Sequence, residues 1–257
     1  MILSIVMYEI LDLIRKRSVW ILLAVYTLTS FLLLSLENIQ NYFPYVESNM
    51  ILLLNIILPA FLTLICFAAL PSAYVQDREQ HIDELSATCL VGKKLRNTAK
   101  MAGIVLFSLL VTQLLLITTV LLYTVIGHPN WSTEIVHVGW DLTLFPVWPV
   151  SRHLVLSAVC FSYGAAILSA VIGLISYKAS STVSSLGITS MFLLFEFLFH
   201  KFSFPAVLKE INVFVFLQPY YLFVMTLLHW SPFINLLVLT MVFSPLYILL
   251  FWQIRRR

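Results

Sequence analysis

MAGIVLFSLLVTQLLLITTVLLYTVI forms residues 101–126 and contains no Asp, Glu, Lys or Arg. A helix needs about 20 mainly apolar residues to cross the hydrocarbon core of a membrane. The stretch therefore predicts a membrane-spanning helix. The whole chain follows the same pattern, because 61% of its 257 residues are hydrophobic and only 11% are charged. Soluble domains carry about 25% charged residues, so this composition argues against a water-facing globular fold.

Other apolar blocks predict five further spans, at residues 18–36, 50–74, 153–177, 181–200 and 232–253. Only helices and closed barrels satisfy their backbone groups in lipid, and the chain lacks the alternating strands of a barrel. We therefore expect an all-α, polytopic integral membrane protein with six transmembrane helices in a single domain, residues 1–257. No cysteine framework and no cleavable signal peptide are indicated.

The C-terminal stretch leaves six or seven spans open, because no Asp, Glu, Lys or Arg occurs between Glu210 and Arg255. Basic residues near span ends favour the cytoplasm. Six spans place twelve of the fifteen basic residues there, together with both termini, and are preferred. Residues 205–228, whose apolar part is 211–228, then form a re-entrant segment broken near Pro219. An interfacial helix lying flat is the alternative.

Residues 1–17 have an amphipathic pattern. Apolar side chains recur at helical spacing, and polar ones, Glu9 and Asp12 among them, occupy the other side. This pattern predicts a helix lying at the inner membrane interface. The helix is either a simple anchor before the first span or an element with a coupling role.

The longest predicted cytoplasmic segment is VQDREQHIDELSATCLVGKKLRNTAK, residues 75–100. Acidic residues come first and basic residues last, an order that suits a helix dipole. Gly92 would end the helix by permitting a left-handed conformation. We expect a coupling helix at residues 76–92 that docks on a partner, with a solvated connector as the alternative.

Several polar residues lie within the predicted membrane segments. Glu196 is the one carboxylate inside a span, and intramembrane ionisable groups are functional candidates. His200 follows it by one helical turn and could satisfy it instead. Asn55 and Gln113 are candidates for the same path, although such residues more often form interhelical hydrogen bonds. Small residues in the fourth and fifth spans predict a tight hairpin between them.

Catalytic and cofactor motifs are not recognisable. Gly92-Lys93-Lys94 lacks the earlier glycine and the final hydroxyl residue of a phosphate-binding loop. No His-Glu-x-x-His zinc motif, nucleophile motif or close histidine pair occurs. We expect neither enzymatic activity nor a catalytic, cofactor or metal site in this chain.

The order of these parts resembles the membrane subunit of a type-2 ABC exporter, of the ABC-2 permease family. That family has an amphipathic N-terminal helix, six spans, a cytoplasmic docking helix after the second span and a re-entrant pair before the sixth. The most specific stretch is residues 77–100, with Glu79, Leu85-Ser86-Ala87-Thr88 and Lys100 at matching places. Cys89 stands where the family often has a proline.

The resemblance implies a division of labour. A separate cytoplasmic ABC ATPase subunit would bind ATP and Mg, and this chain would bind neither. ATPase docking would fall to Glu79, Asp83, Glu84, Leu85 and Thr88. A second permease chain, identical or related, and membrane lipids are the other partners; nucleic acid is not one.

The substrate path would include Pro219 and Tyr220 of the re-entrant segment beside Asn55, Gln113 and Glu196. The exported substrate would be amphipathic or hydrophobic: a peptide, an antimicrobial or a drug-like compound. Two alternatives are kept: a non-catalytic membrane immunity or scaffold protein, and a permease for a lipid-linked polysaccharide. The expected location is the cell membrane, multi-pass, with cytoplasmic termini.

Overall fold

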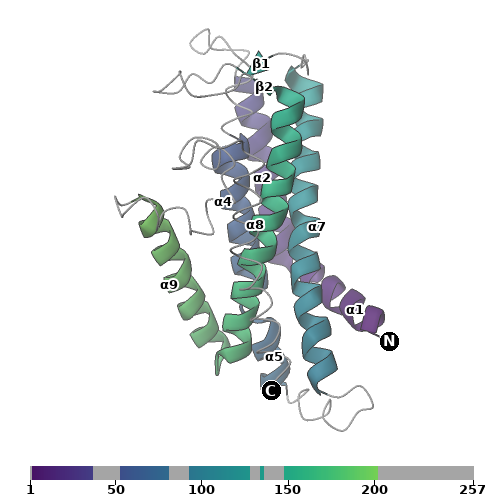
Figure 1. Cartoon of the computed structure of the whole chain (residues 1–257), viewed down its shortest axis with the longest axis vertical. Coiled ribbons are helices and arrows are strands. Elements are labelled where there is room, and N and C mark those ends of the chain that lie inside the picture. Colours follow the sequence, from purple (N-terminus) through teal and green to yellow (C-terminus); the bar gives the residue numbers. More distant parts are fainter. Residues whose placement is uncertain (1, 37–52, 81–92, 128–133, 136–147, 202–257) are drawn as a thin grey trace.

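The computed structural model describes residues 2–36, 53–80, 93–127, 134–135 and 148–201 (Figure 1). The predicted sixth span at 232–253 and the predicted re-entrant segment at 205–228 lie outside these residues. So do residues 81–92, which make up most of the predicted coupling helix.

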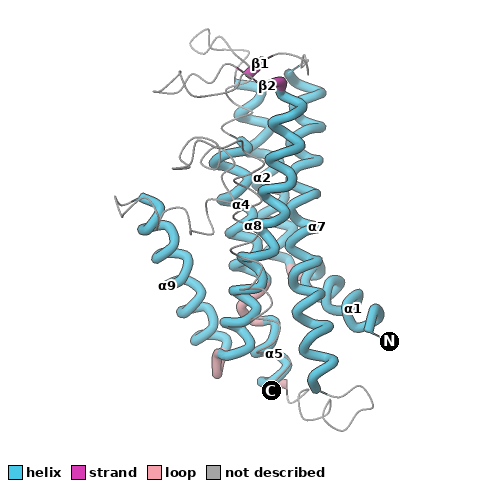
Figure 2. Tube along the Cα trace, viewed as in Figure 1, coloured by secondary structure: helices cyan, strands magenta, loops and turns pink. Residues whose placement is uncertain are grey.

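The described elements are almost entirely helical (Figure 2), as the sequence predicts. They are α1 (Ile2–Arg15), α2 (Arg17–Leu36), the π-helical turn η1 (Leu53–Ile57), α4 (Leu58–Ala69), α5 (Ala73–Glu79), α7 (Lys93–Gly127), α8 (Val150–Lys178) and α9 (Thr182–Lys201). The exception is a two-residue antiparallel pair, β1 (Glu134–Ile135) with β2 (Trp148–Pro149), at the end of the bundle where α8 begins.

Four segments in the described part of the chain are long and apolar enough to cross a membrane: Arg17–Ser35, Leu58–Glu79, Lys94–Ile126 and Ser157–Lys178. They correspond to the first four predicted spans and give the chain the architecture of a membrane protein. The predicted fifth span at 181–200 is helical as α9, but its described apolar part, Thr182–Phe195, is shorter than a full crossing.

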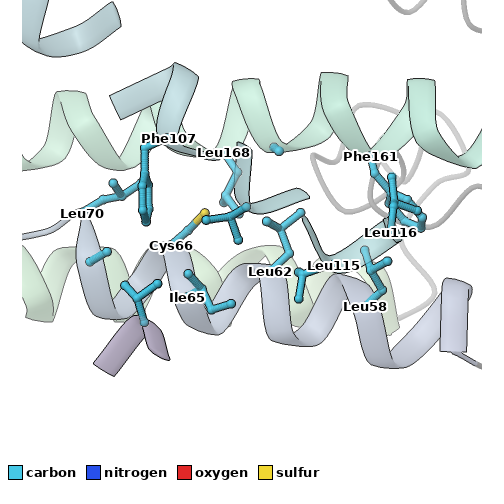
Figure 3. Close-up of a cluster of buried hydrophobic side chains, with 14 of the residues drawn as sticks. Leu58, Leu62, Ile65, Cys66, Leu70, Phe107, Leu115, Leu116, Phe161 and Leu168 are labelled. Carbon is cyan, nitrogen blue, oxygen red and sulfur yellow. The ribbon is translucent and has the colours of Figure 1, made fainter. Parts of the chain in front are cut away.

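The helices α2, α4, α7 and α8 stand upright beside one another, α1 crosses one end of this bundle, and α9 leans away from it (Figure 1). We call the end where α1 and α5 lie the base. The core is built from α2, α4, α7 and α8, and Figure 3 shows Leu62, Phe107, Phe161 and Leu168 among its buried side chains. Other large apolar side chains, such as Leu110 and Leu121, are exposed on the outside, as expected for helices that face lipid.

The helix of the second span is interrupted near its end. The helix α4 ends at Ala69, and α5 begins at Ala73. Pro71 lies between them and has no N–H with which to continue the hydrogen-bond ladder. The first residues of the predicted coupling helix, 76–79, are helical as the end of α5; the rest of that prediction lies outside the described residues. We refer to residues 70–72 as the helix break.

The predicted tight packing of the fourth and fifth spans is found only near the turn that joins α8 to α9 (Figure 1). The small residues of α8 face α7 instead: Ser169 Oγ lies 2.9 Å from Ser108 Oγ, and Gly173 faces Met101. In contrast, Gly187 on α9 has open space around it. The two helices meet near their connecting turn and diverge beyond it (Figure 1). Small residues permit a close approach but do not decide which neighbouring helix makes it.

The helix α1 crosses α7 closely at Gly103. A Cβ atom added there would lie 2.9 Å from Glu9 Cβ and 3.4 Å from the carbonyl oxygen of Val6. Both obstacles lie on or next to the backbone of α1, so a larger residue could be accommodated only if the helix moved.

Gly103→Ala should therefore lower the stability of the protein in detergent by about 1–3 kcal/mol, because overpacking forces backbone shifts. Gly187→Ala is the matched control, since it makes the same change on a helix in open space. It should leave stability unchanged or raise it by up to about 1 kcal/mol through helix propensity. Thermal unfolding midpoints measure both, and equal effects at the two positions would contradict the close crossing.

Candidate functional site

The helix break exposes backbone groups that a continuous helix would satisfy, and a lysine outside the span satisfies one of them. Lys16 lies between α1 and α2, and its Nζ donates to the carbonyl oxygen of Ala69 at 2.6 Å and to Ser72 Oγ at 2.9 Å. A cation at the C-terminal end of a helix also interacts favourably with the helix dipole. Lys16 thus caps the last turn of α4.

Two serines from α8 and α9 complete the support of the helix break. Ser185 Oγ donates to the carbonyl oxygen of Pro71 at 2.6 Å. Ser176 Oγ accepts a hydrogen bond from the backbone N–H of Tyr74 at 3.0 Å. The carbonyl oxygen of Ser176 also accepts from the Arg78 guanidinium at 2.9 Å. Buried backbone groups need hydrogen-bond partners. At the helix break, side chains from separate helices supply them.

A cluster of four charged side chains lies beside α5 at the base. Asp77 on α5 forms ion pairs with Arg96 at 2.6 Å and Lys100 at 2.7 Å, both on α7. Lys100 also lies 3.4 Å from Glu9 on α1. We call Glu9, Asp77, Arg96 and Lys100 the charge cluster. It joins three helices and contains two formal charges of each sign, so it is neutral overall.

Tyr74 packs against the charge cluster. Lys100 Nζ lies 5.6 Å from the centre of the Tyr74 ring, within the range of a cation–π interaction. The Tyr74 hydroxyl donates to the carbonyl oxygen of Asn97 at 2.8 Å. The opposite edge of the ring meets Tyr177 on α8, with the ring centres 5.4 Å apart. The tyrosine thereby connects α5 to both α7 and α8.

Burial makes these charges interdependent. The side chains of Lys100 and Glu9 are only 4% and 8% exposed. Burial raises the pKa of Glu9 above its usual value, and the attraction of Lys100 opposes that rise. Burial likewise lowers the pKa of Lys16, while the nearby Asp12 carboxylate acts in the opposite direction. Removing one member of such a group leaves another charge buried and unpaired.

The position of Glu9 corrects the predicted amphipathic pattern of the N-terminal helix. The sequence placed Glu9 on the polar side, whereas the structure buries it beside Val6, Ile10 and Leu13. Leu3 and other predicted members of the apolar face are exposed instead. The buried Lys100 of α7 supplies the reason, because its charge attracts the carboxylate to this face. An isolated carboxylate among apolar residues was the signal in the sequence, but its partner lies 91 residues further along, at Lys100.

Glu79 is the one predicted docking residue that the structure describes, and it contacts another part of the same chain. Its carboxylate accepts hydrogen bonds from the backbone N–H and the hydroxyl of Thr182, each at 3.1 Å. Thr182 begins α9, where a negative charge is favourable. The other predicted docking residues, Asp83, Glu84, Leu85 and Thr88, lie outside the described residues.

Among the predicted path residues, Gln113 is the best defined. Its Nε2 donates to Ser162 Oγ on α8 at 2.8 Å, so it forms an interhelical hydrogen bond. It lines an open groove of about 470 Å³ on the outer surface of α7 and α8. The groove is otherwise lined by Leu109, Ala158, Val159, Ser162, Tyr163 and Ala166. Gln113 thus faces outward, away from the core formed by α2, α4, α7 and α8.

The remaining path candidates are not brought together. Asn55 lies in η1, and Glu196 lies in α9, but the positions of both side chains fall outside what the structure describes. Pro219 and Tyr220 lie outside the described residues altogether. Within the described residues, no group of His, Cys, Asp and Glu side chains could hold a metal ion.

Comparisons with known proteins identify no relative. No protein-family model, no curated protein and no solved structure matches the chain. The assignment to a family therefore rests only on the resemblance of the sequence and is a proposal.

Glu9→Gln should change how the stability of the protein depends on pH. The ordinary pKa of this carboxyl is 4.5, and the folded protein raises it. Glu9 therefore favours the folded state below about pH 4.5, and this contribution is lost as the pH rises through the folded pKa. The glutamine is neutral throughout. Thermal unfolding midpoints of the variant and the unmodified protein are compared across this pH range. As the pH rises above about 4.5, the midpoint of the variant should increase relative to that of the unmodified protein. A relative decrease would contradict the raised pKa of Glu9.

Lys16→Met should destabilise the protein by about 1–3 kcal/mol, because it leaves the carbonyl of Ala69 and the hydroxyl of Ser72 without their charged donor. Lys94→Met is the matched control, since Lys94 is exposed on α7. The control should change stability by no more than about 0.5 kcal/mol. Unfolding midpoints in the same detergent compare the two variants. Similar shifts for both would show that Lys16 does not hold the helix break.

Proposed function

We propose that this chain is the membrane-spanning permease subunit of an ATP-driven exporter of the type-2 ABC family. It would move an amphipathic or hydrophobic substrate, such as a peptide, an antimicrobial or a drug-like compound, out of the cell. A separate cytoplasmic ATPase subunit would hydrolyse ATP, and a second permease chain would complete the path through the membrane.

The observation that carries the proposal is the way α5 is held. The end of this seven-residue helix overlaps the predicted docking stretch, the coupling helix at residues 76–92. Its side chains bind α7 through Asp77, α8 through Arg78 and α9 through Glu79. A displacement imposed on the docking stretch would therefore be felt by most of the bundle. Such linkage is what a transport subunit requires if a nucleotide-driven partner is to favour one of its states over another.

The distribution of basic residues supports the proposed orientation. Lys16, Arg78, Arg96 and Lys100 all lie at the base, because each contacts the helix break, α5 or the end of α8. Basic residues near the ends of spans favour the cytoplasmic side. We therefore place the base, the N-terminus and the docking stretch in the cytoplasm, where a soluble ATPase would be accessible.

The proposal predicts that the chain co-purifies from its native cells with an ATP-binding subunit and has no ATPase activity when isolated. Asp83→Lys with Glu84→Lys should lower the amount of partner recovered by about tenfold or more, because like charges at an interface are unfavourable. Glu134→Lys is the control: it reverses a charge at the opposite end of the bundle (Figure 1) and should leave the recovery unchanged.

Two outcomes would contradict this proposal. Unchanged recovery of the partner after the double reversal would remove the docking role of Asp83 and Glu84. Retention of the cellular function after the partner ATPase is disabled would favour a non-catalytic immunity or scaffold protein. Export of a lipid-linked polysaccharide would keep the permease class and change the substrate.

A further inference from the structure

Lys100 is shared unequally between two carboxylates that belong to different helices. Its Nζ lies 2.7 Å from Asp77 on α5 and 3.4 Å from Glu9 on α1. The shorter distance is that of a strong, charge-assisted hydrogen bond, and the longer one is not. Asp77 also has Arg96 as a partner. Glu9 is thus the under-paired member of the charge cluster in this arrangement.

The two carboxylates differ in how firmly their helices are attached to α7. Glu9 lies where α1 crosses α7 at Gly103, in backbone contact too close for a Cβ atom. Asp77 lies on a short helix joined to α4 through the helix break, where Pro71 interrupts the ladder. The backbone of α5 packs mainly against α8, whereas that of α1 packs extensively against α7. Movement at the base therefore separates Asp77 from Lys100 more readily than it separates Glu9 from Lys100.

The charge cluster can divide into two neutral pairs, Asp77 with Arg96 and Glu9 with Lys100. The Asp77 and Arg96 side chains are 14% and 16% exposed, whereas Glu9 and Lys100 are nearly buried. Arg96 stays beside Asp77 in this division. Lys100 and Glu9 then remain together in the interior, and no buried charge is left alone, an arrangement that would otherwise be strongly unfavourable.

We propose that the charge cluster is a two-position ion-pair switch. Lys100 pairs with Asp77 while α5 is docked, and it passes to Glu9 when α5 swings away about residues 70–72, with Asp77 leaving beside Arg96. Glu9 is the second acceptor of this switch and a positioning residue. The switch goes beyond the proposed function, because it operates whatever partner or ligand moves α5.

The undocking of α5 can be measured as the labelling rate of a cysteine placed at Val75, a residue of α5 that is 0% exposed. A Val75→Cys protein that also carries Cys89→Ser retains Cys66 and Cys160, both of which are buried. A membrane-permeant maleimide would be used on the full chain in membranes. Asp77→Asn should speed labelling about tenfold, because it weakens the docked ion pairs.

Glu9→Gln distinguishes a switch from a static cluster. The switch predicts labelling about tenfold slower, because undocking would leave Lys100 without its second carboxylate. Adding Glu9→Gln to Asp77→Asn should likewise slow the labelling of the Asp77→Asn protein. Glu134→Gln, the same chemical change at the opposite end of the bundle (Figure 1), is the control and should have no effect. Misfolding cannot imitate the expected result, because unfolding exposes Val75→Cys and speeds its labelling.

Unchanged or faster labelling in the Glu9→Gln protein would overturn the switch. That outcome would leave the proposed function untouched, because ATPase pairing is measured separately through Asp83 and Glu84. Conversely, a chain with no ATPase partner could still show the switch, since the labelling experiment needs no partner.

Discussion

Charges buried at one end of an apolar bundle must neutralise one another, and this constraint organises the base of the protein. Lys100 lies within a helix that is otherwise suited to the membrane, and it is almost completely removed from solvent. It therefore needs carboxylates close by. Asp77 and Glu9 supply them from two other helices. The positions of α1 and α5 against α7 follow from this requirement as much as from apolar packing.

The helix break imposes a second, related constraint. Interrupting a buried helix frees backbone groups, and these need hydrogen-bond partners among the neighbouring side chains. Lys16, Ser176 and Ser185 do so from three directions. The break comes directly before α5, and Asp77 of the charge cluster lies along α5. Polar contacts therefore attach α5 to the bundle beside the apolar packing of its buried residues Tyr74 and Val75.

These polar contacts differ in kind from those in the rest of the molecule. Along the upright helices, contacts are made by apolar side chains such as Leu62 and Phe161, with small hydroxyl pairs such as Ser108 and Ser169 between α7 and α8. Packing of this type is insensitive to small movements of charge. The base instead holds groups that can exchange partners, so mechanical coupling and stability depend on the same residues there. A transport subunit driven from the cytoplasm would need both properties at that end.

The sequence by itself predicted a helical chain and located the four described segments that are long and apolar enough to cross a membrane, because hydropathy over some 20 residues is a local property. It also predicted an N-terminal helix. Only the tertiary structure decided that Glu9 is buried, that the small residues of α8 face α7, and that Lys16 caps the helix break. Each of these outcomes pairs groups that are distant in the chain, Glu9 with Lys100 and Lys16 with Ala69. Periodicity reports which faces a helix has, but the neighbour that covers each face is set by the packing of the whole bundle.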